Sequence, residues 1–550
     1  MRATCSLALG LLFSGTALGQ QCDDPTRVVE GGRFELRVNG TGLAFDSSQV
    51  SLYYTDARGA RSALVYIQGV WVTARDQEGE ILVAAQNFQG LAGDEQGDFY
   101  PGPLSRTRGQ RDTSGRFCTP AAVTAAEIAA HLADLADGHL NDPLPAIMQW
   151  PGRGNPGIDF SFDTGPLAPF VDEDGDGRYD PTRGDYPAII GDYAVWWVMN
   201  DEDVHEESRS DPLGVEVQGL LQGFTNADDD LNGVLKLTYT VTNSVGRALD
   251  SVAVALWQDG DIGCWADDAL GTLPELDAIY LYNVDEVDGF ANSGCDEETT
   301  LENELPALVT QLLDVRLDGG ATPFRTGAIA VSGPVTGTSV PFGIRDPTPG
   351  RAKEYDRLTR GRWRNGEPLR ASGNGYQTDG PITDWIYPGN PAEDGSWSAC
   401  QGAGGDFRAL LSARPDAPLA DGQTLTLDYI IAALDDVEVP CPDNGPIAAA
   451  LERVTALVQG RPLVSSAPAP PAGAGLAVYP NPSGPAGFTI ALPSALAPSR
   501  LTVADGAGRL VREVTATVPE HHIVGLPTGF YVVTAHLPDG SRRAQRVLID

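Results

Sequence analysis

An acidic loop that begins at Asp172 has the residue types and spacing most typical of an ion site. Asp172, Asp174 and Asp176 alternate in a D-x-D-x-D-G run that ends at Gly177. Alternate carboxylates in a tight loop can point inward around a hard cation, and the glycine permits the sharp turn. An EF-hand would need glutamate at the twelfth position, where this chain has Arg183. The sequence therefore predicts a calcium loop that is not an EF-hand.

Two further carboxylates, Asp180 and Asp185, could complete the shell of this ion. The loop is similar to the calcium loops of dockerins and thrombospondin type 3 repeats, and the alternative is a solvated acidic turn. Asp259 and Asp261 form a second candidate metal site with D-x-D spacing, followed by the acidic pair Asp267-Asp268. Calcium at such loops would stabilise the folded state, because an ion that binds only the native protein shifts the folding equilibrium toward it.

Motifs for catalysis are absent or incomplete in the sequence. Neither a G-x-S-x-G nucleophile elbow nor a P-loop occurs. His205-Glu206 begins an H-E-x-x-H zinc motif, but Arg209 stands at the second histidine position. A glycosidase needs only two carboxylates at a three-dimensional separation, so such a pair would be invisible in sequence. We therefore assign no catalytic residue and keep two hypotheses: a non-enzymatic protein with a structural, adhesive or binding role, and a secreted hydrolase of glycosidase type.

The cysteine count favours disulfides formed in an oxidising compartment. Of the 7 cysteines, Cys5 lies in the predicted signal peptide described below, which leaves an even number in the mature chain. The shortest loops favour the pairs Cys264–Cys295 and Cys400–Cys441, which leaves Cys22–Cys118 as the third pair. No two cysteines have C-x-x-C spacing, so a zinc ribbon is not expected.

Charge and targeting signals limit where this protein can act. Residues 1–19 have the basic start, apolar run and small residues of a secretory signal peptide, and no later apolar run is long enough to span a bilayer. The formal net charge of −38 excludes nucleic acid and anionic membrane surfaces as main partners, because like charges repel. Lysine occurs only at positions 236 and 353, which fits both a saline habitat and a genome that favours arginine codons.

The elements that must position these residues are predicted to be mainly strands. Alternation of apolar and polar residues predicts strands over 33–38 and 235–241, with a continuation over 249–257, and the turn residues 243–246 predict that 235–257 is a hairpin. Apolar runs predict strands over 62–74 and 80–85, and a further strand is expected over 423–433. Helical periodicity predicts helices over 121–136 and 447–459. A chain of 550 residues is too long for one ordinary core. We therefore expect a multi-domain, mainly β protein: a β-sandwich body with few helices over 20–460, divisible near 165–215, a linker of Pro, Ala and Ser over 461–475, and a small immunoglobulin-like sandwich over 476–550.

The C-terminal module has regularly spaced short strands with turn residues between them. It contains Tyr479-Pro480-Asn481-Pro482, a D-x-x-G-R turn that includes Gly508, the strand that begins Gly529-Phe530-Tyr531, and a basic, apolar last strand from Arg542 to Ile549. These features resemble the type A C-terminal sorting domain of type IX secretion substrates, and the alternative is an ordinary immunoglobulin-like module that binds a partner. The resemblance implies that the outer-membrane translocon reads the module, that sortase-like machinery then removes it, and that the protein can be linked to surface lipopolysaccharide.

The body also resembles a known group of proteins over roughly residues 30–460. The residues that carry this resemblance occur in order along the chain, at 98–103, 150–155, 172–187, 196–201 and 214–217. They are similar to the uncharacterised extracellular body of many type IX substrates of Bacteroidetes-like bacteria, a group without assigned catalytic residues. The resemblance implies a location at the outer cell surface or in the medium, reached through the periplasm.

Overall fold

The structure is a computed structural model that describes the chain with several gaps. The described residues are 22, 26–43, 50–56, 58–88, 97–105, 110–137, 139–158, 164–225, 230–244, 246–285, 287–289, 295, 306–332, 340–400, 404–435, 437–464, 477–479, 487–491, 499–505, 509–516, 520–536 and 542–549. The predicted signal peptide and most of the predicted linker lie outside them. Among these residues, no helix is both long and apolar enough to cross a membrane.

The chain divides into two compact units. The first, which we call the body unit, comprises residues 1–121, 160–167 and 195–455. The second unit comprises residues 122–159, 168–194 and 456–550. Each unit is described by itself below.

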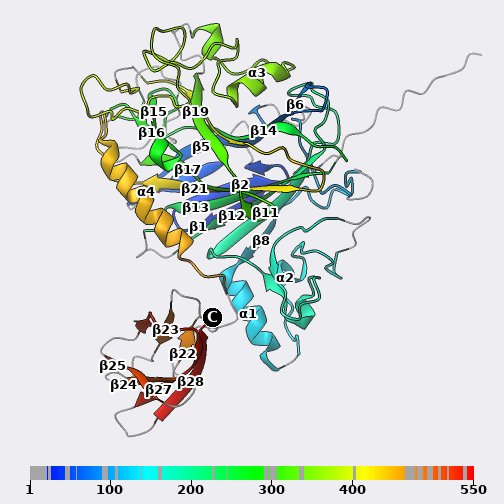
Figure 1. The fold of residues 1–550 in the computed structure, drawn as a ribbon, viewed down its shortest axis with the longest axis vertical. Coiled ribbons are helices and arrows are strands. Elements are labelled where there is room, and N and C mark those ends of the chain that lie inside the picture. Colours follow the sequence, from blue (N-terminus) through cyan, green and yellow to red (C-terminus); the bar gives the residue numbers. More distant parts are fainter. Residues whose placement is uncertain are drawn as a thin grey trace, which may run out of the picture. The chain divides into compact units, whose positions relative to one another are not determined.

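One sheet of the body unit has nine antiparallel strands in the order β1-β2-β4-β5-β14-β20-β19, with β3 beside β2 and β6 beside β5 (Figure 1). The strands β5 and β14 lie near its middle and are buried over most of their length. The bounds are β1 (Arg27–Gly31), β2 (Phe34–Asn39), β3 (Gly42–Leu43), β4 (Leu52–Thr55), β5 (Arg61–Arg75), β6 (Ile81–Ala85), β14 (Asp250–Gly260), β19 (Phe324–Ser332) and β20 (Phe407–Pro415).

A second antiparallel sheet packs against the first. Its order is β15-β16-β17-β21-β13-β12-β11-β7, with β18 beside β17. Thr310 Oγ1 of β17 donates a 2.9 Å hydrogen bond to Gln258 Oε1 of β14, so the two sheets face each other as a β-sandwich. The bounds are β7 (Tyr100–Pro101), β11 (Tyr193–Asn200), β12 (Val215–Gly223), β13 (Val234–Asn243), β15 (Asp268–Leu273), β16 (Ala278–Asn283), β17 (Ala307–Leu317), β18 (Gly320–Ala321) and β21 (Thr424–Leu434).

The predicted hairpin over 235–257 is wrong, although both of its strands form. β13 pairs with β12 and β21 in the second sheet, whereas β14 pairs with β5 and β20 in the first. The chain therefore crosses from one layer of the sandwich to the other between Asn243 and Asp250. Strands β13 and β14 each have a neighbour on both sides. The hydrogen bonds that a hairpin would form between them are instead made with strands distant in sequence, β21 for β13, and β5 and β20 for β14.

The helices are few, as the sequence predicts: α1 (Ala125–Asp134), α2 (Pro145–Met148), α3 (Ala352–Leu358) and α4 (Asn444–Gln459). Helix α1 starts at a capping box in which Thr124 accepts from the Glu127 amide and Glu127 bonds back to Thr124, which satisfies two free donors of the first turn. The apolar face of α4 is buried at Ile447, Leu451, Val454 and Val458. The periodicity of the sequence therefore identified both longer helices, but residues 121–124 of the first predicted helix form strand β8 instead.

The second unit contains short strands and a C-terminal sandwich. Its C-terminal part has a three-stranded sheet, β22-β23-β26, and a four-stranded sheet, β25-β24-β27-β28. Their buried apolar side chains form one core, which includes Phe488, Leu501, Val533 and Val547. The bounds are β8 (Ala121–Thr124), β9 (Phe170–Val171), β10 (Tyr186–Pro187), β22 (Ala477–Tyr479), β23 (Phe488–Ala491), β24 (Ser499–Asp505), β25 (Leu510–Ala516), β26 (Glu520–Ile523), β27 (Gly529–His536) and β28 (Arg542–Ile549).

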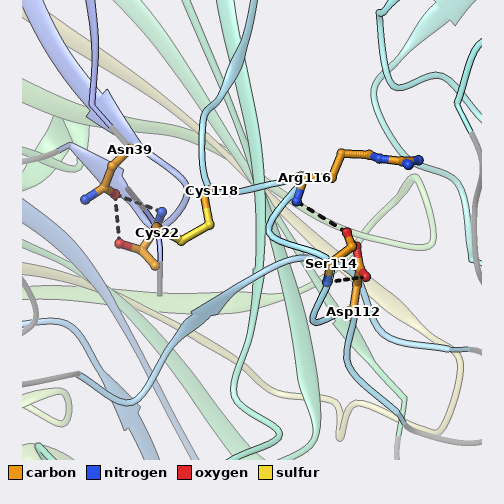
Figure 2. Close-up of a disulfide and its surroundings, with 7 residues drawn as sticks. Cys22, Asn39, Asp112, Ser114, Arg116 and Cys118 are labelled. Atoms are coloured by element: carbon orange, nitrogen blue, oxygen red, sulfur yellow. Dashed lines mark hydrogen bonds between the residues drawn. A yellow bond between two sulfur atoms is a disulfide. The ribbon is translucent and has the colours of Figure 1, made fainter. Parts of the chain in front are cut away.

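Three disulfides crosslink the body unit, and their pairing agrees with the one favoured by the sequence. They are Cys22–Cys118, Cys264–Cys295 and Cys400–Cys441, with Cα–Cα distances of 5.7, 5.6 and 5.3 Å. Figure 2 shows Cys22–Cys118 beside the turn that follows β2, where Asn39 accepts hydrogen bonds from the amide and hydroxyl of Thr41. Gly40 is required in this turn, because a Cβ there would collide with the Phe117 and Cys118 carbonyl oxygens.

Candidate metal centre

Neighbouring strands of the nine-stranded sheet bring four charged side chains together. Asp259 of β14 is the register partner of Arg408 of β20. Side chains two residues apart on extended chain point to the same face, so Asp261 lies beside Asp259, and Asp406 lies beside Arg408. We call Asp259, Asp261, Asp406 and Arg408 the acidic centre.

The three carboxylates of the acidic centre are close and buried. One oxygen from each lies within 4.8 Å of the other two. The exposed fractions of Asp259, Asp261 and Asp406 are only 2%, 7% and 8%. Arg408 pairs with two of them, at 2.8 Å from Nη2 to an Asp406 oxygen and 3.3 Å from Nε to an Asp259 oxygen. Its guanidinium also lies over the Phe88 ring, 5.1 Å from the ring centre.

Negative charge exceeds positive charge in this buried region. Asp268, the first residue of β15, is fully buried, and its carboxylate lies close enough to Asp261 to interact with it electrostatically. Asp346 lies on the other side of Arg408, with 3.7 Å between Asp346 Oδ2 and Nη1. Arg364 also acts on Asp346, but it forms its closer ion pair with Glu354 at 2.7 Å. One guanidinium therefore faces several carboxylates without water to separate them.

The protonation of these acids reflects this imbalance. Burial raises the pKa of Asp261, and the neighbouring Asp406 acts in the same direction. Arg408 opposes this increase, and the resulting pKa is about 8. Burial also raises the pKa of Asp259, Asp268 and Asp406, while Arg408 opposes the increase at Asp259 and Asp406. These carboxyl groups can all be ionised near neutral pH only if additional positive charge reaches the centre.

Several oxygens in this region have unused capacity for a ligand. Asp268 Oδ1 is buried and accepts no hydrogen bond, and Asp259 Oδ1 has only its ion pair with Arg408 Nε. The second oxygen of Asp268 accepts from the Ile262 amide at 3.1 Å. Within the described part of the chain, no hydrogen bond or ion pair reaches the carboxylate of Asp261. Carboxylate oxygens are the donors that Ca²⁺ prefers, and two ligands on opposite sides of that ion are about 5 Å apart, so the donor set fits the ion.

The loop from Asp172 to Asp176, in the second unit, is arranged differently. Its three carboxylates also approach within 4.8 Å, but Asp174 and Asp176 are exposed. The guanidinium of Arg183 pairs with Asp174 at 2.7 Å and with Asp176 at 3.3 Å. The Asp172 carboxylate accepts from the amides of Gly175, Asp176 and Gly177. Arg183 stands at the twelfth position, where an EF-hand has a metal-binding glutamate. In this loop its guanidinium provides the positive charge that a metal ion would otherwise provide.

The other predicted metal ligands have separate hydrogen-bonding roles. Asp180 caps the short turn at Pro181–Arg183 by accepting from the Thr182 amide at 3.0 Å. Asp185 is fully buried and accepts from the amides of Glu173 and Asp180 at 2.9 and 2.7 Å. Calcium binding by the loop from Asp172 to Asp176 therefore stays a prediction. Asp180 and Asp185 lie next to this loop and act as hydrogen-bond acceptors.

A second buried ionic group in the body unit is built around His205. Nδ1 of the ring lies 2.8 Å from the Val83 carbonyl oxygen, and Nε2 lies 2.9 Å from that of Asp201. A carbonyl oxygen can only accept, so both ring nitrogens carry a proton and the imidazole is charged. The carboxylates of Asp98 and Asp201 lie 3.8 and 3.5 Å from the ring nitrogens. The sequence drew attention to His205 only through the incomplete zinc motif.

The sorting residues are described only in part. Pro480, Asn481, Pro482 and Gly508, and the side chain of Tyr479, lie outside the described residues. Gly529 begins β27, and Tyr531 is 5% exposed in the core of the C-terminal sandwich. The Tyr531 hydroxyl donates a 2.8 Å hydrogen bond to the Pro527 carbonyl, which holds the strand against the turn before it.

Sequence reasoning identified half of the acidic centre and missed the rest. It named Asp259 and Asp261 from their D-x-D spacing, but not Asp406 or Arg408, which are adjacent only through strand pairing. The D-x-R run at Asp406 to Arg408 is a short charged alternation next to an apolar segment, which is a signal too common to select one site.

Comparisons with known proteins identify no family. No protein-family model and no curated protein matches the chain. A structure described as a polysaccharide lyase aligns with 61% of this chain and 34% of its own at 11% identity and a TM-score of 0.17. PorZ, a surface component of the type IX secretion system of Porphyromonas gingivalis, aligns with 68% of this chain and 48% of its own at 12% identity and a TM-score of 0.13. The chain thus spans about a third and about half of these two proteins, and at such TM-scores neither likeness bears on fold or function.

Proposed function

We propose that this chain is a secreted or cell-surface protein, exported by the type IX secretion system, whose β-rich body is stabilised by calcium and has a structural, adhesive or binding role. Its partners in export would be the outer-membrane translocon and the sortase-like machinery, with surface lipopolysaccharide as an attachment point. The observation that carries the calcium part is the excess of buried carboxylate over buried cation around Arg408.

The export part of the proposal rests on other features. Three disulfides in the body unit are typical of proteins that fold outside the cytosol. The described strands of residues 477–549 form a small sandwich, which is the fold expected of a sorting module. The residues of the sorting motif in the sequence then give this sandwich its proposed role in export.

The glycosidase hypothesis receives less support than the binding hypothesis. Asp259 and Asp261, two of the clustered acids of the body unit, are 2% and 7% exposed, which leaves a sugar no direct access to them. Catalytic carboxylates must touch the glycosidic oxygen and the anomeric carbon. Buried acids without such access are better suited to holding an ion that stabilises the fold.

Thermal unfolding of the purified mature protein tests the calcium part. The melting temperature should be higher in excess calcium than in a chelator, because an ion that binds only the folded state stabilises it. Calcium added back after the chelator should restore the higher value. Equal melting temperatures in both buffers would contradict the proposal that calcium stabilises the body.

A further inference from the structure

We infer that the acidic centre of the body unit binds one calcium ion through Asp259, Asp261 and Asp406. This assignment rests on the proposed calcium stabilisation and gives it a location. It also selects the acidic centre over the more obvious loop at Asp172 to Asp176.

The arrangement of the strands explains why an ion fits here. Asp259 lies near the end of β14, Asp406 directly precedes the paired strand β20, and Arg408 takes one oxygen of each. Arg408 therefore orients two ligands and neutralises part of their charge. It cannot also satisfy Asp261, whose carboxylate has no hydrogen bond or ion pair among the described residues. A divalent ion placed among the three oxygens would supply the missing partner.

The buried oxygens without hydrogen bonds are the second observation that points to a ligand. An oxygen that is removed from water and left without a partner destabilises a fold by roughly 1–3 kcal/mol, and more when it is charged. Asp268 Oδ1 meets this description, and the carboxylate of Asp261, which is 7% exposed, has no hydrogen bond or ion pair among the described residues. Carboxylates rather than histidine or cysteine surround the space, which favours Ca²⁺ over Zn²⁺ or Cu²⁺.

The loop at Asp172 to Asp176 lacks these properties. Arg183 already pairs with two of its three carboxylates, and the amides of the turn occupy the third. Its charges are also largely exposed, so water screens their repulsion. The loop therefore has partners for its carboxylates without an ion, whereas the Asp261 carboxylate of the acidic centre has none among the described residues.

The test compares single substitutions at the two places in the full mature protein. Asp261→Asn and Asp406→Asn should remove most of the calcium-dependent rise in melting temperature and weaken calcium binding about tenfold or more in calorimetry, because each removes a charged ligand. The double variant Asp174→Asn, Asp176→Asn is the matched control and should keep the rise. In chelator, Asp261→Asn should melt no lower than wild type, since it relieves repulsion between buried carboxylates. That measurement separates loss of the ion from loss of the fold.

Each outcome has a separate meaning. Suppose that the calcium-dependent rise in melting temperature is retained in Asp261→Asn but lost in the double variant Asp174→Asn, Asp176→Asn. This result would overturn the assignment and leave the proposed calcium stabilisation intact. No calcium response in wild type would contradict both. An equal response to Mg²⁺ and Ca²⁺ would overturn the choice of calcium, because Mg²⁺ needs a smaller, more regular shell than these carboxylates are expected to provide.

Discussion

Replacement of His205 by glutamine should destabilise the body unit strongly at neutral pH and only weakly at alkaline pH. The folded structure holds His205 as an imidazolium, because both ring nitrogens donate to backbone carbonyls and two carboxylates lie within 4 Å. Glutamine keeps a hydrogen-bond donor at this position and removes the charge. The variant therefore isolates the contribution of the charge.

The magnitude follows from the pKa of His205. Burial of the ring lowers that pKa, but Asp201 and Asp98 outweigh it and raise the value from 6.5 to about 9. Each unit of pKa corresponds to about 1.4 kcal/mol, so the charged ring contributes roughly 3 kcal/mol to the free energy of unfolding. Because the folded pKa lies above the unfolded one, this contribution is complete below about pH 6.5 and is lost as the pH rises through about 9.

The assay is urea unfolding of wild type and His205→Gln across pH 6 to 10, followed by tryptophan fluorescence. Trp71 and Trp257 are fully buried near this region, so their emission reports loss of the body core. The difference in unfolding free energy should be largest at pH 6 and shrink toward pH 10. Glu206→Gln changes the exposed neighbour and should match wild type throughout. If the unfolding free energies of wild type and His205→Gln differed by the same amount at every pH, a charged imidazole would be refuted.

Three other outcomes can be measured independently. Calcium should stabilise the protein more at pH 8 than at pH 5. The pKa of Asp261 is about 8 in the folded protein without the ion, and its proton must leave before calcium binds. A calcium-dependent rise in melting temperature that is the same at both pH values would contradict this prediction. Mass spectrometry of unreduced, alkylated mature protein should find no free thiol, and Cys400→Ala with Cys441→Ala should lower the free energy of unfolding by about 2–4 kcal/mol; a labelled Cys264 would argue against full pairing. Deletion of residues 476–550 should leave the protein in the periplasm, and normal surface levels of the truncated protein would contradict the sorting role.

The parts of the fold that the sequence predicted are those set by local rules. The helices α1 and α4 follow from apolar spacing, and the capping box at Thr124 marks where α1 begins. Strand positions follow from alternation and turn residues. Pairing does not, because a turn at residues 243–246 permits either a hairpin or a crossing between layers. The structure takes the crossing, with β13 and β14 each completed by strands distant in sequence.

The candidate site was predictable only to the extent that its ligands are neighbours in the chain. Asp259 and Asp261 share one strand end, so their spacing was visible. Asp406 and Arg408 reach them through the register of β14 with β20, which no local pattern encodes. The loop at Asp172 carried the stronger sequence signal, yet Arg183 occupies two of its carboxylates. Spacing indicated where acids gather, and tertiary structure decided which acids lack a partner.

The two buried ionic groups of the body unit provide an internal comparison that favours an ion at only one of them. Around His205, the Asp98 carboxylate accepts from the amides of Ala85, Glu207 and Ser208, and Asp201 accepts from those of Leu213 and Val215. One positive ring and five amides there serve these two carboxylates. The buried Glu207 beside them accepts from Asn87 and Tyr355 through Oε1, while its Oε2 accepts no hydrogen bond. Around Arg408, one guanidinium serves at least three carboxylates, and few amides contribute. Donors of the chain serve the carboxylates better around His205 than around Arg408, and this difference supports the cation that we propose for the acidic centre.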